Sequence, residues 1–317
     1  MIHREIRSDE AGRKLLRYLE ILLPKAPKSF LYKAIRQKKI RINGKHPKDE
    51  KTVLNAGDQI SLFLTDNQLK DFGYSNISAS GTDGIELDRF PQARIVYEDD
   101  RLLIVDKPVG ITTQKGKNDP VSLTEIMRHY LAKDQETSPS SYHPSFCHRL
   151  DKNTSGLLIM AKTLASHQAL QQMLEKRQVK KYYLAVVQGI PEEWRQETRL
   201  IHRYQKDEKN NQALLSPWEG EGTRVELTVC LIDSFDGKSL VKVDLISGKS
   251  HQIRAQLAYE GFPIIGDGKY DEKTHVFRQQ LVAYELFFEQ PDELLSDLEG
   301  KRFYAEIPDT WKKQFTL

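Results

Sequence analysis

Hydrophobic and polar positions near the start of the chain follow two periods. Leucines recur at helical spacing over residues 13–23, which predicts a first helix. Ser29 is a candidate cap for a second helix over residues 30–37. Residues 38–45 predict a strand that enters an Asn-Gly turn, a strong hairpin signal, and residues 59–64 alternate as a closing strand. The pattern therefore predicts a small α/β domain.

Residues 66–94 break this pattern. Gly, Ser, Asn and Asp are frequent in them and leave too few apolar residues for a core. We therefore predict a flexible linker, which separates a small domain at residues 1–65 from a larger domain at residues 95–317. Two domains joined in this way can move independently.

The larger domain contains apolar runs of both kinds. Short or alternating apolar runs predict strands at residues 101–106, 155–161, 183–187, 223–231 and 240–246. Helical spacing predicts helices at residues 122–132, 163–177 and 250–261. The helices are too few for a strict alternation with strands. We therefore predict an α+β domain, in which a largely antiparallel mixed β-sheet has flanking helices.

Composition indicates a globular protein, since 38% of the 317 residues are hydrophobic and 29% are charged. No apolar run approaches the length of a membrane-spanning helix, and the N-terminus lacks the apolar core of a signal peptide. Two cysteines, Cys147 and Cys230, argue for a reducing compartment, and nine scattered histidines show no metal-binding spacing. We predict a cytoplasmic, monomeric protein without a metal or a membrane partner.

Charge is distributed unevenly along the chain. Residues 1–64 hold 15 Lys and Arg against 7 Asp and Glu, a balance of +8 in a chain whose total is +3. A concentrated positive segment is typical of a polyanion-binding module, because its cations neutralise phosphates and release counterions. A solvated charged face is the alternative. The candidate phosphate-binding residues lie on or beside the predicted hairpin and are Arg36, Lys38, Lys39, Arg41 and Lys45.

The run from residue 148 to residue 162 carries the strongest chemical signal. It places Asp151 in a tight turn, with the cations Arg149 and Lys152 beside it, just before an apolar strand. A carboxylate at the mouth of a buried strand is held rigidly, as a nucleophile or a base requires. The alternative is an Asp that caps the turn and pairs with its neighbours, which is the common role of a turn acid.

This run reads His-Arg-Leu-Asp-Lys-Asn-Thr-Ser-Gly, followed by Leu-Leu-Ile-Met-Ala-Lys. It resembles the catalytic motif of RluA-type pseudouridine synthases, whose Asp is essential, and the resemblance implies that role for Asp151. Residues 181–189 resemble a second block of the family, which implies an active-site tyrosine at Tyr183. Residues 248–254 resemble a third, which implies that Arg254 pairs with the catalytic Asp.

Two further blocks, at residues 106–110 and 266–270, extend the resemblance over about residues 95–290. The small basic domain resembles an RNA-binding domain first known from a small-subunit ribosomal protein, which often precedes RluA-type catalytic domains. The resemblance therefore covers both predicted domains and implies that the chain acts on RNA.

Three residues beside the motifs bear on RNA contact. The resemblance implies that Arg149 fills the gap left by an extruded base or clamps the adjoining phosphate, with a surface ion pair as the alternative. Lys249 stands where the family usually has Arg. Because Lys keeps the charge and loses the bidentate fork, we expect it only to contact phosphate. Gln256 stands where a His is common, and we expect it to face away from Arg254.

Pseudouridine formation breaks the bond between N1 of uracil and the ribose, rotates the base and rejoins it through carbon 5. The reaction needs no metal or organic cofactor. It needs a charged carboxylate near the sugar, and the sequence leaves open whether Asp151 attacks the sugar or removes a proton from it. We expect Arg254 to favour the ionised carboxylate, and Tyr183 to stack on the uracil, with a hydroxyl able to relay the proton that leaves carbon 5.

We therefore predict an RNA pseudouridine synthase that isomerises specific uridines in structured RNA by base flipping, with large-subunit ribosomal RNA as the foremost substrate. Transfer RNA is the alternative substrate. A non-catalytic RNA-binding or ribosome-assembly factor is the alternative from another functional class, and the intact set of Asp151, Tyr183 and Arg254 argues against it.

Overall fold

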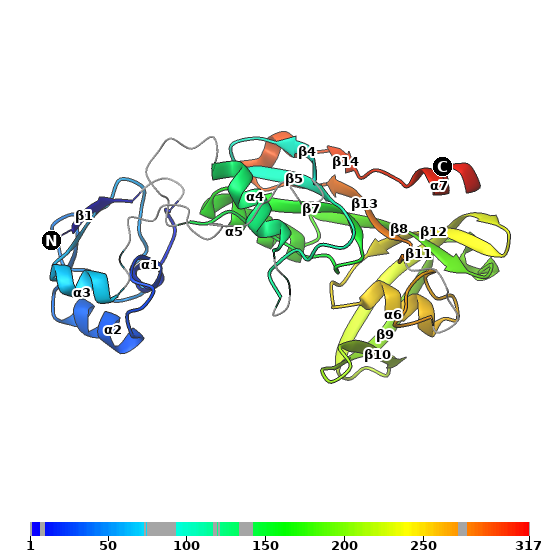
Figure 1. The fold of residues 1–317 in the computed structure, drawn as a ribbon, viewed down its shortest axis with the longest axis horizontal. Coiled ribbons are helices and arrows are strands. Elements are labelled where there is room, and N and C mark those ends of the chain that lie inside the picture. Colours follow the sequence, from blue (N-terminus) through cyan, green and yellow to red (C-terminus); the bar gives the residue numbers. More distant parts are fainter. Residues whose placement is uncertain are drawn as a thin grey trace.

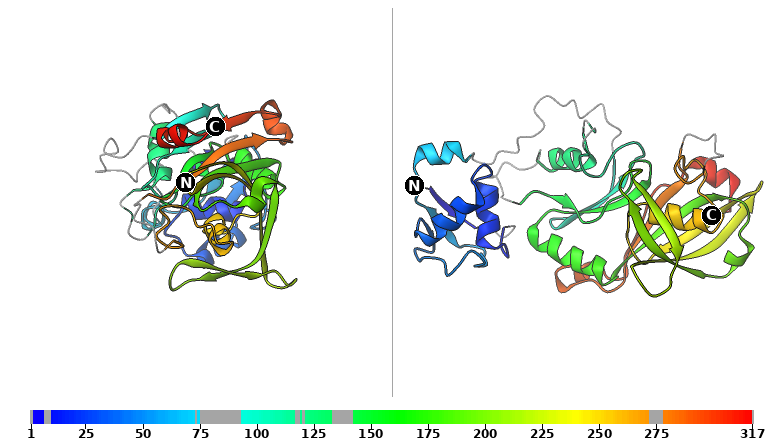
Figure 2. Two further views of the ribbon diagram at one scale, coloured as in Figure 1. Left: turned by 90° about the vertical axis from the view of Figure 1, so that its right-hand side faces the viewer. Right: turned by 90° about the horizontal axis from the view of Figure 1, so that it is seen from below.

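The computed structural model describes residues 2–6, 10–72, 74, 93–116, 119, 121–132, 142–271 and 278–316. Within them the chain forms a small N-terminal body and a larger one built on a single extended sheet (Figures 1 and 2). Most of the predicted linker, from residue 75 to residue 92, lies outside the described residues.

The small body has a three-stranded antiparallel sheet in the order β1-β3-β2, with three helices. Leu15, Leu19, Leu31 and Ile60 are fully buried in a core that draws only on this body. The elements are β1 (Ile2–Glu5), α1 (Leu15–Leu22), α2 (Lys28–Arg36), β2 (Ile40–Ile42), β3 (Gln59–Leu62) and α3 (Asp66–Asp71).

Two local predictions for this body were wrong. Helix α2 begins at Lys28 after Pro27, so Ser29 lies inside its first turn and does not cap it. The Asn-Gly turn forms, with both backbone hydrogen bonds between Ile42 and Lys45, but no strand follows it. Strand β2 pairs with β3 instead, because the apolar face that needs covering belongs to the residues around Ile60.

The predicted linker boundary at residue 65 was also wrong, because α3 lies within the range assigned to the linker. Leu69 of this helix is buried in the small core. Phe72 packs on Phe30 with ring centroids 4.4 Å apart. The backbone carbonyl of Phe72 accepts a hydrogen bond from the backbone N–H of Lys25. These few apolar residues are too sparse for a core of their own, yet they suffice to extend an existing one as far as Tyr74.

The larger body is built on an eleven-stranded sheet with the order β10-β9-β11-β12-β8-β13-β7-β5-β4, to which β14 is added on β13 and β6 on β7. Every pair is antiparallel except β13 and β7. The strands are β4 (Arg94–Glu98), β5 (Leu102–Lys107), β6 (Ser145–Phe146), β7 (Ser155–Ala161), β8 (Val179–Gln188), β9 (Thr198–Asp207), β10 (Gln212–Pro217), β11 (Thr223–Phe235), β12 (Lys238–Leu245), β13 (Leu281–Phe288) and β14 (Arg302–Tyr304). This topology confirms the predicted α+β class with a largely antiparallel mixed sheet.

The apolar residues of this sheet form two clusters, one on each face, and helices cover both faces. The first face is covered by α4 (Leu123–Ala132) and α6 (Gln252–Tyr259), and the second by α5 (Leu164–Glu175), α7 (Asp309–Gln314) and the 3₁₀ turn η3 (Glu293–Leu298). A further 3₁₀ turn, η2 (Glu192–Arg195), buries Trp194 against the first face. All three helices predicted for this domain are present, and Thr163 caps α5, its hydroxyl accepting from the N–H of Ser166.

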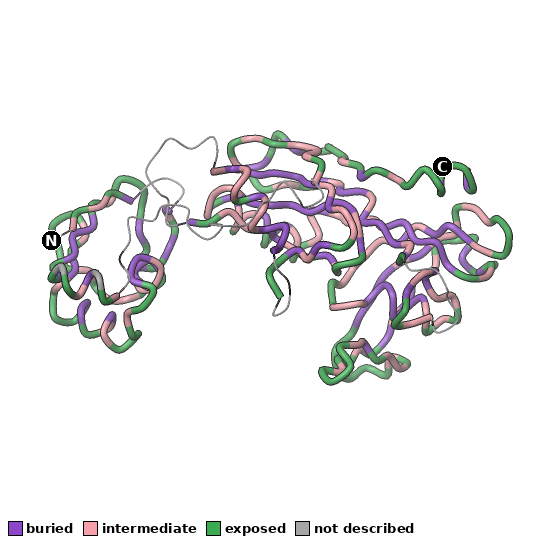
Figure 3. The backbone as a smooth tube through the Cα atoms, viewed as in Figure 1, coloured by how far each residue is buried: buried purple, intermediate pink, exposed green. Residues whose placement is uncertain are grey.

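Strand β7 shows why its sequence is a continuous apolar run. Leu158 and Met160 point into the cluster on one face, whereas Leu157, Ile159 and Ala161 point into the cluster on the other. A strand covered on both faces has no solvent side and therefore no polar alternation. Figure 3 shows much of the central strands in purple, the colour of buried residues.

The start of β7 depends on a glycine at the one parallel contact in the sheet. Gly156 has a φ of +114°, and a Cβ built there would lie 2.2 Å from the carbonyl oxygen of Ala283 on β13. No side chain fits this close approach of two backbones. The contact fixes where the preceding loop, residues 148–154, enters the sheet.

Gly156→Ala should therefore destabilise the fold strongly, because the methyl group must push β7 from β13 or break their pairing. We expect a loss of about 3 kcal/mol or more, as for overpacked and strained sites, measured by urea unfolding. Gly237→Ala is the matched control. Gly237 also has a positive φ, +69°, but a Cβ there meets nothing within 4 Å, so it should cost only about 1 kcal/mol. Equal losses in the two variants would contradict this account of the β7–β13 contact.

Candidate active site

The loop before β7 presents Asp151 to a pocket and is fixed by backbone and hydroxyl hydrogen bonds. The hydroxyl of Thr113 donates to the carbonyl of Leu150 and accepts from its N–H, both at 3.1 Å. The backbone N–H of Thr154 donates to the carbonyl of Asp151 at 3.1 Å. Because these bonds hold the backbone on both sides, the side chain of Asp151 has a fixed starting point.

A buried lysine holds the other side of the same loop. The Nζ of Lys107 donates to the carbonyls of Pro108 and Ile111 at 2.9 Å and of Lys152 at 3.2 Å. Burial lowers the pKa of Lys107 to about 7, an effect that the charge of Asp151 opposes. Three carbonyl acceptors favour the ammonium form, since only that form has three donors. Lys107 therefore ties the loop of Asp151 to the turn after β5.

The guanidinium of Arg254 joins two carboxylates. Its Nη1 lies 2.8 Å from Oδ2 of Asp151, while Nε and Nη2 lie 2.6 and 2.7 Å from the two carboxylate oxygens of Asp267. Burial alone would lower the pKa of Arg254, but the hydrogen bonds and charges of Asp267 and Asp151 outweigh it and raise this pKa above its ordinary value. The predicted contact between Arg254 and Asp151 is present in the structure.

Asp267 was not predicted as a site residue. Its side chain is fully buried, and its two oxygens bind Nε and Nη2 of Arg254, while Nη1 donates to Asp151. The sequence signal was the block at residues 266–270, which resembles a family block but names no partner. Asp267 orients the guanidinium, because a planar group bound at two points can no longer rotate freely.

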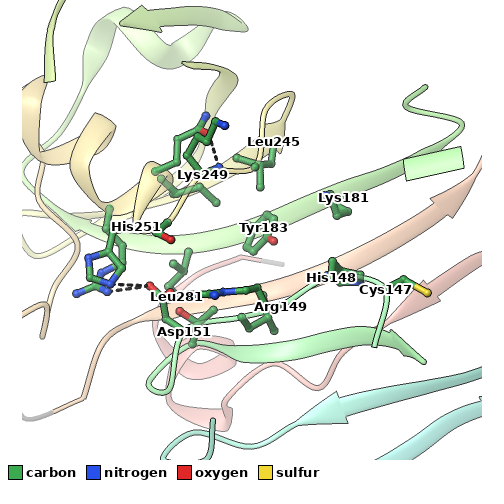
Figure 4. Close-up of a pocket in the computed structure, with 17 residues that line it drawn as sticks. Cys147, His148, Arg149, Asp151, Lys181, Tyr183, Leu245, Lys249, His251 and Leu281 are labelled. Atoms are coloured by element: carbon green, nitrogen blue, oxygen red, sulfur yellow. Dashed lines mark hydrogen bonds and ion pairs between the residues drawn. The ribbon is translucent and has the colours of Figure 1, made fainter. Parts of the chain in front are cut away.

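Tyr183, on β8, forms part of the wall of the pocket that contains Asp151. The residue is 5% exposed, and the pocket encloses about 360 Å³. Burial, followed by the charge of Asp151, raises the pKa of Tyr183, so its phenol keeps its proton. Figure 4 shows Tyr183 between the loop of Asp151 and the segment that holds Lys249. The structure thus brings the three predicted catalytic residues to one pocket.

Arg149 and Lys249 are exposed and line the same pocket. Neither forms an ion pair with the residues that the structure describes, so the surface ion pair considered for Arg149 is not seen there. Gln256 faces away from Arg254 as expected. It is fully buried and bonds to Gln252 and to His202 at 2.9 and 3.0 Å. Gln256 therefore ties α6 to β9.

Cys147 and His148, at the far end of the pocket, are neutral. Burial, followed by the charge of Lys181, lowers the pKa of His148 to about 3, and its Nε2 accepts the N–H of Ile159 at 3.2 Å. Burial raises the pKa of the Cys147 thiol to about 12, which disfavours the thiolate that reactive cysteines need. His148 and Cys147 thus support β7 and supply no charge to the pocket.

The five predicted phosphate-binding residues of the small body lie on and around α2 and β2. Arg36, Lys38, Arg41 and Lys45 are exposed and Lys39 is half-buried. Arg41 lies over the ring of Phe63, with its guanidinium carbon 5.0 Å from the ring centroid. Their cationic groups are therefore open to a polyanion.

Two negative findings apply to the described residues alone. No helix among them is long and apolar enough to cross a membrane. No group of three His, Cys, Asp or Glu side chains in this part of the chain is placed to hold a metal ion.

Comparison with known proteins agrees with this geometry. A family model for RNA pseudouridylate synthases matches residues 101–259. Ribosomal large subunit pseudouridine synthase C of Vibrio cholerae is 30% identical over 285 residues, which cover 89% of this chain and 85% of that protein. The protein of the same name from Haemophilus influenzae is 28% identical over 316 residues, which cover 97% and 92% of the two chains.

The fold has solved counterparts. The structure titled human RNA Pseudouridylate Synthase Domain Containing 4 superposes with a TM-score of 0.53 at 20% identity, covering 69% of this chain and 90% of that one. Human RNA Pseudouridylate Synthase Domain Containing 1 gives 0.51 at 21% identity, covering 70% and 94%. The family match spans the strands and helices that carry Asp151, Tyr183 and Arg254. The chain belongs to the RNA pseudouridine synthase family and converts uridine to pseudouridine in RNA.

Proposed function

We propose that this enzyme modifies uridines of large-subunit ribosomal RNA and that Asp151 is its catalytic carboxylate. One observation carries the assignment of Asp151, namely that its carboxylate is held 2.8 Å from the buried Arg254 in the pocket lined by Tyr183. The names of the relatives from Vibrio cholerae and Haemophilus influenzae support the choice of RNA.

Asp151 acts as a carboxylate in this proposal, and Arg254 is its cationic partner. Nη1 of Arg254 lies 2.8 Å from Oδ2 of Asp151, whose side chain is 23% exposed. The ionised Asp151 then either attacks the ribose carbon that bears N1 or removes a proton from the ribose. Both routes place the same carboxylate beside the sugar, and both stay open.

Tyr183 has two roles in this proposal. Its ring supplies a flat apolar wall on which the uracil can stack after it leaves the RNA helix. Its phenol is protonated, since burial and Asp151 raise its pKa. It can therefore relay the proton released from carbon 5 by donating and accepting through one hydroxyl, without passing through a free phenolate.

Arg149 and Lys249 would serve RNA binding. Both are exposed cations that line the pocket. Arg149 is two residues from Asp151, where it can fill the gap left by the extruded base or hold the adjoining phosphate. Lys249 would contact phosphate as a point charge.

The small body would supply affinity through phosphate contacts. Its core is separate from the clusters of the large sheet. The two bodies approach each other at Gly12 of the small body and Gln168 of the larger one. A Cβ built on Gly12 would lie 3.4 Å from the side-chain oxygen of the exposed Gln168. We further propose that the enzyme acts as a monomer in the cytoplasm.

Asp151→Asn should abolish pseudouridine formation and leave RNA binding intact, because Asn keeps the size of the side chain and loses its charge. The test is to map pseudouridines in total RNA from cells that lack the protein and carry the wild-type or the Asn gene. Wild type should restore sites in large-subunit ribosomal RNA, and the variant should restore none. Sites restored only in transfer RNA would refute the proposed substrate, and sites restored by the Asn variant would refute the role of Asp151.

Arg254→Ala should remove activity and lower stability, because it leaves two carboxylates without their cation. We expect a loss of about 3–5 kcal/mol, as for broken buried ion pairs, measured by urea unfolding. Asp267→Asn should retain the fold better and lose part of the activity, since it loosens the guanidinium without removing it. Arg195→Ala, at an exposed pair with Glu192, is the matched control and should leave melting unchanged. Unchanged activity and an unchanged free energy of unfolding in Arg254→Ala would show that the pairing of Arg254 with Asp151 and Asp267 has no role.

Deleting residues 1–74 should weaken RNA binding and flatten its dependence on salt, because fewer phosphates are neutralised. Filter binding at several salt concentrations measures both effects. The truncated enzyme should stay folded and still modify RNA at high concentration. The full-length control carries Ala at the cationic positions Arg36, Lys38, Lys39, Arg41 and Lys45, and it should reproduce the change in salt slope. An insoluble truncation, or an unchanged slope in both proteins, would contradict the separation of affinity from chemistry.

A further inference from the structure

A chain of polar contacts connects Asp151 to the hairpin of β9 and β10. The backbone N–H of Ala213, on β10, donates to the hydroxyl of Tyr270 at 2.7 Å. That hydroxyl lies 3.2 Å from Nδ1 of His251, and Nε2 of the same ring lies 3.7 Å from Oδ2 of Asp151. Figure 4 shows His251 facing Asp151 across the pocket.

The donors and acceptors in this chain favour one position for the imidazole proton. The hydroxyl of Tyr270 accepts a hydrogen bond from Ala213 and can donate its own proton to Nδ1 of His251. A neutral imidazole that accepts at Nδ1 carries its hydrogen on Nε2. In this tautomer the N–H of His251 points towards Asp151.

His251 is neutral in this environment. Burial lowers its pKa, and the charges of Arg254 and Lys269 lower it further, while those of Asp151 and Asp267 act in the opposite direction with a smaller effect than burial. A neutral donor can support Asp151 without competing with Arg254 for its charge.

The position of the ring is also constrained. His251 precedes α6 with a left-handed backbone, φ 57°, and its side chain is 11% exposed. The ring of Tyr270 meets it edge to face, with centroids 6.0 Å apart and planes at 88°. Tyr270 is fixed in turn, because the neighbouring Lys269 donates through Nζ to the carbonyls of Asn210 and Asn211 at 3.4 and 2.9 Å.

We propose that His251 is a positioning residue for Asp151 and that Tyr270 sets its tautomer. Arg254 and His251 both lie beside Oδ2 of Asp151, whereas Oδ1 has no hydrogen-bond partner among the described residues. The pair thus turns Oδ1 towards the uridine. This inference rests on the proposed role of Asp151. The distance of 3.7 Å is longer than a hydrogen bond, as is common before substrate binds, and should shorten in the complex.

The test compares two amides at position 251. The amide nitrogen of Gln reaches the place of Nε2, whereas the amide of Asn reaches only that of Nδ1. With total RNA from a strain that lacks the gene as the probe, His251→Asn should lower the rate at saturating enzyme about tenfold, the value of one hydrogen bond, with half-saturation unchanged. His251→Gln should restore the rate to near that of wild type.

Tyr270→Phe supplies the second arm. It should slow wild-type enzyme several-fold and have no further effect on His251→Asn, because the two residues act as one unit. Nitrogen-15 NMR of the imidazole gives a readout without catalysis. His251, identified by the signal absent from His251→Asn, should show hydrogen on Nε2 in wild type and a mixture of tautomers in Tyr270→Phe.

The outcomes separate this inference from the proposal on which it rests. Equal rates for the Asn and Gln variants, or an effect of His251→Asn on half-saturation alone, would overturn the positioning role, the latter in favour of direct RNA contact. A wild-type tautomer with hydrogen on Nδ1 would overturn it too, even where a variant fails to fold. Activity of Asp151→Asn in the same assay would instead refute the role of Asp151.

Discussion

The site depends on one guanidinium that binds two carboxylates. Arg254 comes from α6, Asp151 from the loop before β7, and Asp267 from the segment before β13. Without the bidentate contact to Asp267, a long arginine side chain would lose rotamer freedom to reach Asp151. With it, a buried pair holds the guanidinium in place, and Nη1 donates to Oδ2 of Asp151. Asp267 is therefore what makes the contact with Asp151 directional.

This arrangement needs a rigid platform, which the sheet supplies. The loop of Asp151 is held after that residue by the close β7–β13 approach at Gly156 and by the contact of Lys107 with the carbonyl of Lys152. Before Asp151 it is held by the two hydrogen bonds between Thr113 and Leu150. Two clusters of apolar residues cover β7 on both faces. The position of the carboxylate is thus determined by the most buried part of the molecule, even though Asp151 itself is open to the pocket.

The sequence predicted most of the parts whose signal is contiguous. Asp151, Tyr183 and Arg254 each lie in a short block with its own pattern, and β7 is a continuous apolar run. Strand β13, although mostly apolar, was not predicted, and neither were β9, with polar residues on both faces, and the short β10. The contacts of Asp267 and His251 in the site were missed for another reason. Both are set by contacts between separate segments, which no local pattern records.

The charges in the pocket explain why the site needs cations beyond Arg254. Two carboxylates share one guanidinium, and His251 is neutral, so this group carries a net negative charge. Such a charge repels the phosphates that flank a uridine. Arg149 and Lys249 are exposed cations that line the same pocket. In the proposed function they offset this repulsion at the surface of the pocket, so that a negative centre and a polyanion can lie close together.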